Sequence, residues 1–135
     1  MMEHVIIVGG GRVGRHVAEQ LSEERYDVTV IELDGHACDQ VAPHADRVIE
    51  GDGTDPDVFE QANPGDADIV AALTNDTELN LAICEMAYDY SADVRTLLRV
   101  ARDGEQAYGY RDFVDDVVYP AAAGATAAVS RINRV

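Results

Sequence analysis

Short apolar runs alternate with amphipathic stretches along this chain, and a new apolar run begins roughly every 20 to 25 residues, as in repeated βαβ units. Most of these runs are continuous stretches of Val, Ile and Leu. Continuous runs are typical of parallel strands that are covered on both faces. The pattern therefore predicts six strands, at residues 4–8, 28–33, 47–50, 69–73, 95–100 and 117–119.

The segments between the runs predict helices. Asp55 is a typical N-cap residue and Pro56 a typical first helical residue, so we expect a helix through Val58, Phe59 and Ala62 that stops at residues 63–65. Other segments carry apolar stripes at helical spacing that should face a core. These stripes are Val13, Val17 and Leu21 in a helix beginning near Arg12, Leu79, Ile83 and Met86 in a later helix, and Ala121, Ala125, Ala128 and Ile132 in a last helix at about residues 121–134.

The order of these elements predicts the fold class. Parallel crossover connections are nearly always right-handed, so six strands joined in this way favour a doubly wound sheet. We expect a Rossmann-type α/β fold with strand order 3-2-1-4-5-6, helices on both faces, and one domain spanning residues 1–135. Ligands bind such sheets where the strand order reverses, here between strands 1 and 4.

Residues 9–14, with the sequence Gly-Gly-Gly-Arg-Val-Gly, follow the first predicted strand and open the first predicted helix. This is the context of the dinucleotide-binding fingerprint. Gly9 permits the tight turn, Gly11 lets the backbone approach a pyrophosphate, and Gly14 lets the helix pack against the strand. The N–H groups at the helix start favour an anion, and Arg12 can add a charge-assisted contact to phosphate.

An acidic residue, Glu32, stands near the end of the second predicted strand, about 20 residues after the loop. A carboxylate at this place accepts hydrogen bonds from ribose hydroxyls and repels a 2′-phosphate, which favours NAD(H) over NADP(H). The alternative is a structural glycine-rich turn beside a solvated Glu32.

Two more polar residues follow predicted strands at the same edge. Asp52, after the third strand, is either a contact to the adenine or its ribose or a solvated turn residue. Thr74, after the fourth strand, either contacts the ligand or only caps the next helix.

The composition is strongly acidic, with 26 Asp and Glu against 10 basic residues, all of them Arg, and a formal net charge of −16. The acids are spread along the chain, which favours adaptation to concentrated salt over an acidic face for a basic partner. No basic stripe is present to bind nucleic acid. With neither a signal peptide nor an apolar stretch long enough to span a bilayer, we expect a cytoplasmic chain without direct membrane insertion.

The two cysteines, Cys38 and Cys84, lie far apart, without a C-x-x-C spacing or a nearby His cluster. Neither a disulfide framework nor a metal site is predicted. We expect both to be small apolar residues on helices.

Taken in order, the motifs resemble the TrkA-N, or RCK/KTN, domains, which regulate potassium channels and transporters by binding nucleotides. The resemblance runs from the first strand to about Ala128. It rests on residues 8–14, 30–34, 50–54, 72–80, 98–100 and 117–120.

The resemblance implies a ligand site. The glycine loop would hold the phosphates, Glu32 the ribose and Asp52 the adenosine side, while Arg99 would contact the rest of the ligand or form a structural ion pair. Family members bind NAD(H), ATP or ADP; we expect NAD(H), with ATP or ADP as the alternative. The expected ligand-binding residues are Gly9, Gly10, Gly11, Arg12, Val13, Gly14, Glu32, Leu33, Asp34, Asp52, Gly53, Leu73, Thr74, Asn75 and Arg99.

Two departures from the family pattern accompany this resemblance. Thr77 stands where the family often carries an acid. The C-terminal ligand-binding lobe of such proteins does not occur in these 135 residues. Two interpretations of the chain are therefore left: an excised N-terminal domain or a stand-alone regulatory subunit.

The resemblance also implies partners: a membrane potassium channel or transporter subunit, and a second copy in a homodimer or larger ring formed through the last helix. No paired base and nucleophile is evident among the histidines and other candidate groups. We therefore expect a regulatory nucleotide-binding domain rather than an enzyme. The alternative is a small NAD-dependent oxidoreductase or a detached cofactor-binding domain of one.

Overall fold

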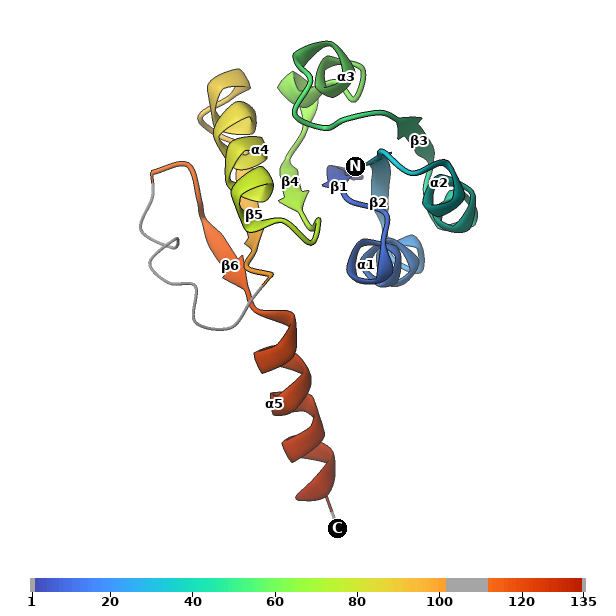
Figure 1. Cartoon of the computed structure of the whole chain (residues 1–135), viewed down its shortest axis with the longest axis vertical. Coiled ribbons are helices and arrows are strands. Elements are labelled where there is room, and N and C mark those ends of the chain that lie inside the picture. Colours follow the sequence, from blue (N-terminus) through green and yellow to red (C-terminus); the bar gives the residue numbers. More distant parts are fainter. Residues whose placement is uncertain (1, 102–111, 135) are drawn as a thin grey trace.

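The computed structural model describes residues 2–101 and 112–134. Six strands form one sheet in the order β3-β2-β1-β4-β5-β6, and every neighbouring pair is parallel (Figure 1). The predicted Rossmann-type doubly wound fold is confirmed, and the predicted strand ends agree within two residues. The strands are β1 (Glu3–Val8), β2 (Tyr26–Glu32), β3 (Arg47–Glu50), β4 (Ile69–Ala72), β5 (Arg95–Arg99) and β6 (Asp116–Val118).

The helices are α1 (Arg12–Ser22), α2 (Gly35–Val41), α3 (Pro56–Glu60), α4 (Thr77–Tyr90) and α5 (Pro120–Ile132), with two 3-10 turns at Ala42–His44 and Pro64–Asp66. Helices α1 to α4 cover the two faces of the sheet, and α5 follows the last strand (Figure 1).

The alternation of side chains along β1 divides the core into two clusters. Val5 and Ile7 pack on the side covered by α1 and α2, and Ile6 and Val8 on the side covered by α3 and α4. Successive residues of a strand point to opposite faces, so a central strand must be apolar at both sets of positions. This requirement explains the continuous apolar run at the start of the sequence.

The predicted element ends that differ from the structure do so by one or two residues, and two of these differences have a clear structural cause. Leu33 lies beyond the end of β2 and is 69% exposed, because the chain leaves the sheet after Glu32 to reach α2. Ala62 lies beyond α3, which ends at Glu60. Asn63 adopts a left-handed conformation, with φ 57° and ψ 57°, and this turns the chain out of the helical path.

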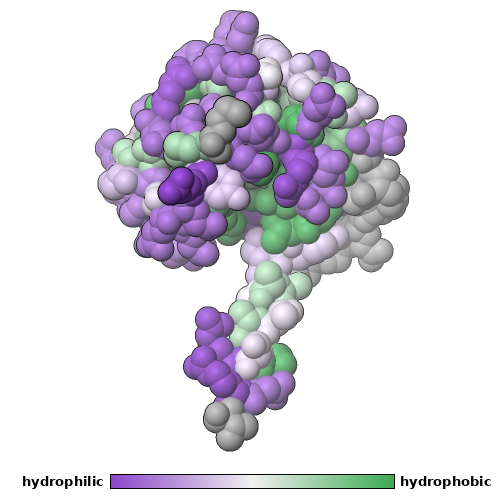
Figure 2. Space-filling view, turned by 180° about the vertical axis from the view of Figure 1, so that it is seen from behind, coloured by the Kyte–Doolittle hydropathy of each residue, from purple (hydrophilic) through white to green (hydrophobic). Residues whose placement is uncertain are grey.

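Helix α5 projects away from the body of the molecule (Figures 1 and 2). Its start at Pro120 and end at Ile132 agree with the predicted last helix within two residues. All of residues 121–134 are exposed, including Val129 and Ile132, so the stripe expected to face a core meets none among the residues that the structure describes. None of the helices in the described ranges is long and apolar enough to cross a bilayer.

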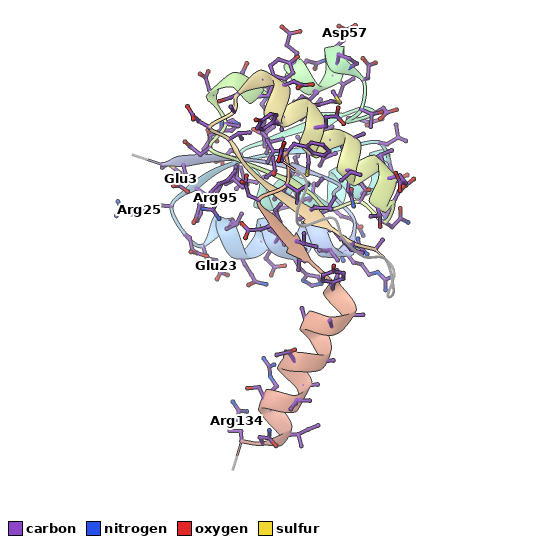
Figure 3. All side chains as sticks on the ribbon, turned by 90° about the vertical axis from the view of Figure 1, so that its left-hand side faces the viewer. Glu3, Glu23, Arg25, Asp57, Arg95 and Arg134 are labelled. Carbon is purple, nitrogen blue, oxygen red and sulfur yellow. The ribbon has the colours of Figure 1, made fainter. Side chains whose placement is uncertain are left out.

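The acidic side chains lie on the surface. None of those in residues 2–101 and 112–134 is buried, and Figure 3 shows Glu3, Glu23 and Asp57 pointing outward. Within these ranges only two ion pairs form: His4 Nδ1 lies 3.3 Å from Asp27, and Arg95 lies 3.8 Å from Asp116. Most of the repulsion among the acids is therefore not offset by pairing. Adaptation to salt stays a prediction.

Both cysteines are buried on helices and free, as predicted, Cys38 on α2 and Cys84 on α4. Burial raises the pKa of the Cys84 thiol to about 12, and the charge of Asp115 adds to the effect. In the part of the chain that the structure describes, no group of three His, Cys, Asp or Glu residues is arranged to hold a metal ion.

Candidate functional site

A cleft of about 1030 Å³ opens at the carboxyl ends of the strands, across the point where the strand order reverses. This volume suits a nucleotide-sized molecule. All of the predicted ligand-binding residues line the cleft except Gly10 and Gly14. The structure thus brings together residues that lie far apart in the sequence, although their contact with a ligand stays a prediction.

Different structural constraints act on the individual glycines of the loop. Gly9 has φ +110°, and a Cβ there would lie 2.9 Å from the backbone nitrogen of Thr74. A Cβ on Gly14 would overlap the carbonyl oxygen of Gly9, which confirms the predicted close packing of α1. A Cβ on Gly11 would meet no protein atom within 4 Å. Packing therefore requires glycine at positions 9 and 14, whereas the space at Gly11 is open to a ligand.

The start of α1 has no side-chain cap and no acid of its own. Gly11 is its N-cap residue and offers no side-chain acceptor, and the first turn contains no acid. By contrast, α2, α3 and α4 are capped by Asp34, Asp55 and Asp76, which confirms the predicted cap at Asp55. The first residues of α1 line the cleft, and among the described residues no side chain caps the positive end of the helix dipole there.

Glu32 is held in place at the rim of the cleft. Its Oε1 accepts a hydrogen bond of 2.7 Å from the backbone N–H of Gly10, and its Oε2 accepts one of 2.8 Å from Asp34. The side chain is half-buried, so it is not the freely solvated residue of the alternative interpretation. A carboxylate has about four lone-pair sites, so both oxygens can accept further hydrogen bonds.

Two other acids at the rim also have structural roles. Asp34 Oδ2 accepts a hydrogen bond of 2.9 Å from the N–H of Ala37 in α2. Asp52 Oδ1 accepts hydrogen bonds from the hydroxyl and the N–H of Thr54, at 2.7 and 2.9 Å, and these bonds lower the pKa of Asp52. The turn role considered for Asp52 is confirmed, and its contact with a ligand stays a prediction.

Thr74 does not cap the following helix, so that interpretation is wrong. Helix α4 begins later, and Asp76 is its N-cap, accepting a hydrogen bond from Leu79 N–H. The Thr74 hydroxyl lies 2.6 Å from Oδ1 of Asn80 instead. Thr74 still lines the cleft, opposite the glycine loop.

Arg99 projects from the end of β5 into the cleft and forms none of the ion pairs found within residues 2–101 and 112–134. The alternative of a structural ion pair is therefore wrong. Its Nη1 donates to the carbonyl oxygen of Leu73 at 3.1 Å, and its buried Nε has no partner in the described ranges. Burial, and then the positive charge of Arg12, lower the pKa of Arg99.

Comparison with known proteins identifies the family. The profile of the TrkA-N domain matches residues 5–120. The chain belongs to the TrkA-N domain family.

Curated relatives of this TrkA-N domain include two archaeal proteins, each named Trk system potassium uptake protein TrkA homolog. The protein from Pyrococcus abyssi is 35% identical over 123 residues, which cover 87% of this chain and 54% of that protein. The protein from Methanothermobacter thermautotrophicus is 38% identical over 119 residues, with the same two coverages. The chain thus spans about half the length of these relatives.

Solved structures share the fold at lower identity. The TrkA-N domain of the inner membrane protein ybaL from Escherichia coli has a TM-score of 0.84 at 21% identity, and the match covers 98% of both chains. The NAD(P)-binding domain of an exopolyphosphatase-related protein from Archaeoglobus fulgidus has a TM-score of 0.82 at 19% identity over the full length of both. GsuK bound to ADP has a TM-score of 0.79 at 23% identity, covering 97% of this chain and 34% of that one.

Three polar or charged residues that line the TrkA-N domain cleft were missed by the site predicted from the sequence. Arg15 and Gln40 line it and are joined by a hydrogen bond of 2.9 Å from Nη1 to Oε1. Arg15 follows Arg12 by one helical turn, a spacing that places both on one face of α1. The third residue, Asp76, was overlooked because its capping role was considered only for Thr74. Among the described residues, the cleft lining thus contains three arginines, two on α1 and one at the end of β5, and four carboxylates, which are those of Glu32, Asp34, Asp52 and Asp76.

Proposed function

We propose that this TrkA-N domain binds an adenine nucleotide in the cleft and that the bound nucleotide regulates a membrane potassium channel or transporter subunit. The observation that carries the proposal is the pairing of a fixed acceptor, Glu32, with an uncapped helix start flanked by Arg12 and Arg99. The acceptor suits ribose hydroxyls, and the cationic end suits phosphates.

The proposed ligand is NAD(H), with ADP or ATP as the alternative. The fixed position of Glu32 supports any adenosine with free ribose hydroxyls, and the buried Nε of Arg99 supports an anionic group beyond it. Among solved structures with this fold, one is named as GsuK bound to ADP and another as an NAD(P)-binding domain from Archaeoglobus fulgidus. Both ligand classes thus occur in the names of proteins with this fold. Both classes belong in the same binding experiment.

The proposed regulatory role rests on the names of the relatives and on α5. The curated relatives are potassium uptake proteins, and this chain corresponds to about half of each. The exposed apolar face of α5 supports pairing with a second copy as a homodimer or larger ring. A nucleotide would shift such an assembly by the difference between its affinities for two arrangements.

A regulatory function also agrees better with the cleft than hydride transfer does. An oxidoreductase needs a group that moves a proton beside the nicotinamide. No histidine lines the cleft in the described ranges: His4 is in β1, His16 on α1, His36 on α2 and His44 in a 3-10 turn.

The test is a thermal-shift and calorimetry series in molar KCl with ADP, ATP, NADH and NADPH. A ligand at 100 times its dissociation constant should stabilise the domain by about 2.7 kcal/mol. The variant that tests whether the loop binds phosphate is Gly11→Asp. An Asp at an N-cap position preserves the helix, while its charge repels phosphate. Absence of a shift with every nucleotide would overturn the proposal, and so would an unchanged shift in Gly11→Asp.

A further inference from the structure

Asn80 is a polar side chain inside the core. It lies in the first turn of α4 and is 0% exposed. An amide in such a place destabilises a protein unless its hydrogen bonds are satisfied. A residue of this kind therefore calls for a specific reason at this position.

All of the hydrogen-bonding capacity of the Asn80 amide is used. Its Oδ1 accepts from the N–H of Thr74 at 3.0 Å and from the Thr74 hydroxyl at 2.6 Å. Its Nδ2 donates to the carbonyl oxygens of Thr74 and Arg99, both at 3.0 Å. Because the N–H can only donate and the two carbonyls can only accept, these partners also fix which amide atom is oxygen and which is nitrogen.

These bonds tie together the ends of two neighbouring strands that line the cleft. Thr74 follows β4, and Arg99 ends β5. The Arg99 guanidinium returns to the β4 side by donating to the carbonyl oxygen of Leu73. Asn80, Thr74, Leu73 and Arg99 thus form a closed ring of covalent and hydrogen bonds.

The same ring touches the glycine loop. A Cβ on Gly9 would come within 3.1 Å of the Leu73 carbonyl oxygen and 2.9 Å of the Thr74 nitrogen, so the loop lies directly on the Leu73–Thr74 peptide. The N–H of this peptide is the group that Asn80 Oδ1 accepts. A shift of the peptide would therefore displace the loop on one side and Arg99 on the other.

We propose that Asn80 is a positioning residue for nucleotide binding, which holds the β4 and β5 ends so that Arg99 and the glycine loop face the same phosphate group. This inference rests on the proposed nucleotide function. Asn80 does not line the cleft and acts through Thr74 and Arg99.

The chemistry of the amide explains why few substitutes fit. Leu is close in size but supplies neither donors nor acceptors, so it leaves the Thr74 N–H and two carbonyls without their partner. Asp retains the acceptors, but its ionised form has no donor for the two carbonyl oxygens. These two changes separate the packing of Asn80 from its hydrogen bonds.

The experiment measures the dissociation constants of ADP and adenosine by calorimetry on the full chain in molar KCl. The variants are Asn80→Leu, Asn80→Asp, and the control Ile83→Ala, which opens the core on the same helix away from the cleft. We expect both Asn80 variants to weaken ADP binding about tenfold or more and adenosine binding much less. Ile83→Ala should weaken neither, although it lowers the melting temperature. Equal losses for ADP and adenosine, or ADP losses as large in Ile83→Ala, would overturn the inference.

A double-mutant cycle with Arg99→Gln tests whether Asn80 acts through Arg99. If it does, the double variant Asn80→Asp with Arg99→Gln binds ADP little more weakly than the weaker single variant. Losses that multiply independently contradict the inference. If the unchanged chain binds ADP but the Asn80 variants bind it equally well, the inference fails and the proposed function stands. If the unchanged chain binds no nucleotide at all, both fail.

Discussion

The positive charge of Arg12, at the start of α1, lowers the pKa of Arg99, at the end of β5. Strands β1 and β5 flank β4, so one cation follows β1 at the start of α1 and the other ends β5, and the two repel each other across the cleft. Burial of Arg99 adds to this cost. An anion between the two side chains would remove both costs, because it supplies each guanidinium with an opposite charge and an acceptor.

Arg12→Gln and Arg99→Gln should each weaken the binding of ADP by roughly 10- to 100-fold, since a hydrogen bond to a charged group contributes about 1.5–3 kcal/mol. Adenosine, which lacks phosphate, should lose little affinity. Arg25→Gln is the matched control, because Arg25 precedes β2 at the opposite edge of the sheet and changes the net charge equally. Calorimetry with both ligands measures the difference. Similar losses in all three variants would indicate a general charge effect and no specific phosphate contact.

Gly14→Ala and Gly11→Ala should have opposite effects. The added Cβ at position 14 overlaps the Gly9 carbonyl oxygen, so we expect a loss of about 1–3 kcal/mol or more in the free energy of unfolding. The added Cβ at position 11 meets open space, so stability should fall by less than about 1 kcal/mol, the cost of Ala at an N-cap, while nucleotide binding is lost. Urea unfolding and ADP titration of both variants provide the check. Normal ADP binding by Gly11→Ala would contradict the role given to the open space.

Glu32→Gln should reduce discrimination against a 2′-phosphate. The unchanged chain is expected to bind ADP much more tightly than 2′-phosphorylated ADP, because the carboxylate accepts from ribose hydroxyls and repels a phosphate. The amide retains one oxygen for the Gly10 N–H but loses the negative charge. The ratio of the two dissociation constants, measured by competition, should fall. Glu50→Gln, on the neighbouring strand and outside the cleft lining, should leave the ratio unchanged.

Stability should rise with salt. The described acids are all unburied and mostly unpaired, and the chain carries a net charge of −16. Between 0.1 M and 1 M KCl the screening length falls from about 10 Å to about 3 Å, which weakens their repulsion. We expect the melting temperature to rise by roughly 10 °C, or about 2–3 kcal/mol for a domain of this size. The gain should shrink as the pH approaches the pI near 4.3, and a melting temperature independent of KCl would contradict the prediction.

Alkaline pH should destabilise the domain through Cys84. Its folded-state pKa of about 12 lies above the ordinary value of 9.0, so the fold favours the protonated thiol. The associated stability is fully present below pH 9 and is lost as the pH rises toward 12, by up to about 4 kcal/mol at 1.36 kcal/mol per pKa unit. Urea unfolding between pH 8 and 11 should show a smaller loss for Cys84→Ala than for the unchanged chain or Ile83→Val. Parallel curves for all three would exclude the effect.

Most of the fold was predictable because its signals are local. The apolar run of β1, the Asp55–Pro56 helix start and the glycine loop can each be recognised from a few consecutive residues. With right-handed crossovers, such signals leave few arrangements of the sheet. The positions of the cleft-lining loops follow from that topology.

The roles of single polar residues were less predictable, because they depend on contacts between distant segments. Thr is a residue type that often caps helices, but the Thr74 hydroxyl forms a hydrogen bond with Asn80, and Asp76 is the N-cap of α4. An arginine at a strand end often forms an ion pair, yet the charge that acts on Arg99 across the cleft is that of another arginine, Arg12. Asn80 itself is a polar residue in an apolar helix, and only the bonds to two strand ends reveal its role.

The projection of α5 has a mechanical consequence. Arg99 is paired with Val118 in the sheet, and Val118 stands two residues before Pro120, where α5 begins. A 13-residue helix is about 20 Å long, so a tilt of about 10° at its root displaces its tip by roughly 3 Å. The start of α5 thus lies close to the cleft, and its tip lies far from it. A change at Arg99 that tilted the start of α5 would therefore move the helix tip farther than the strand end itself.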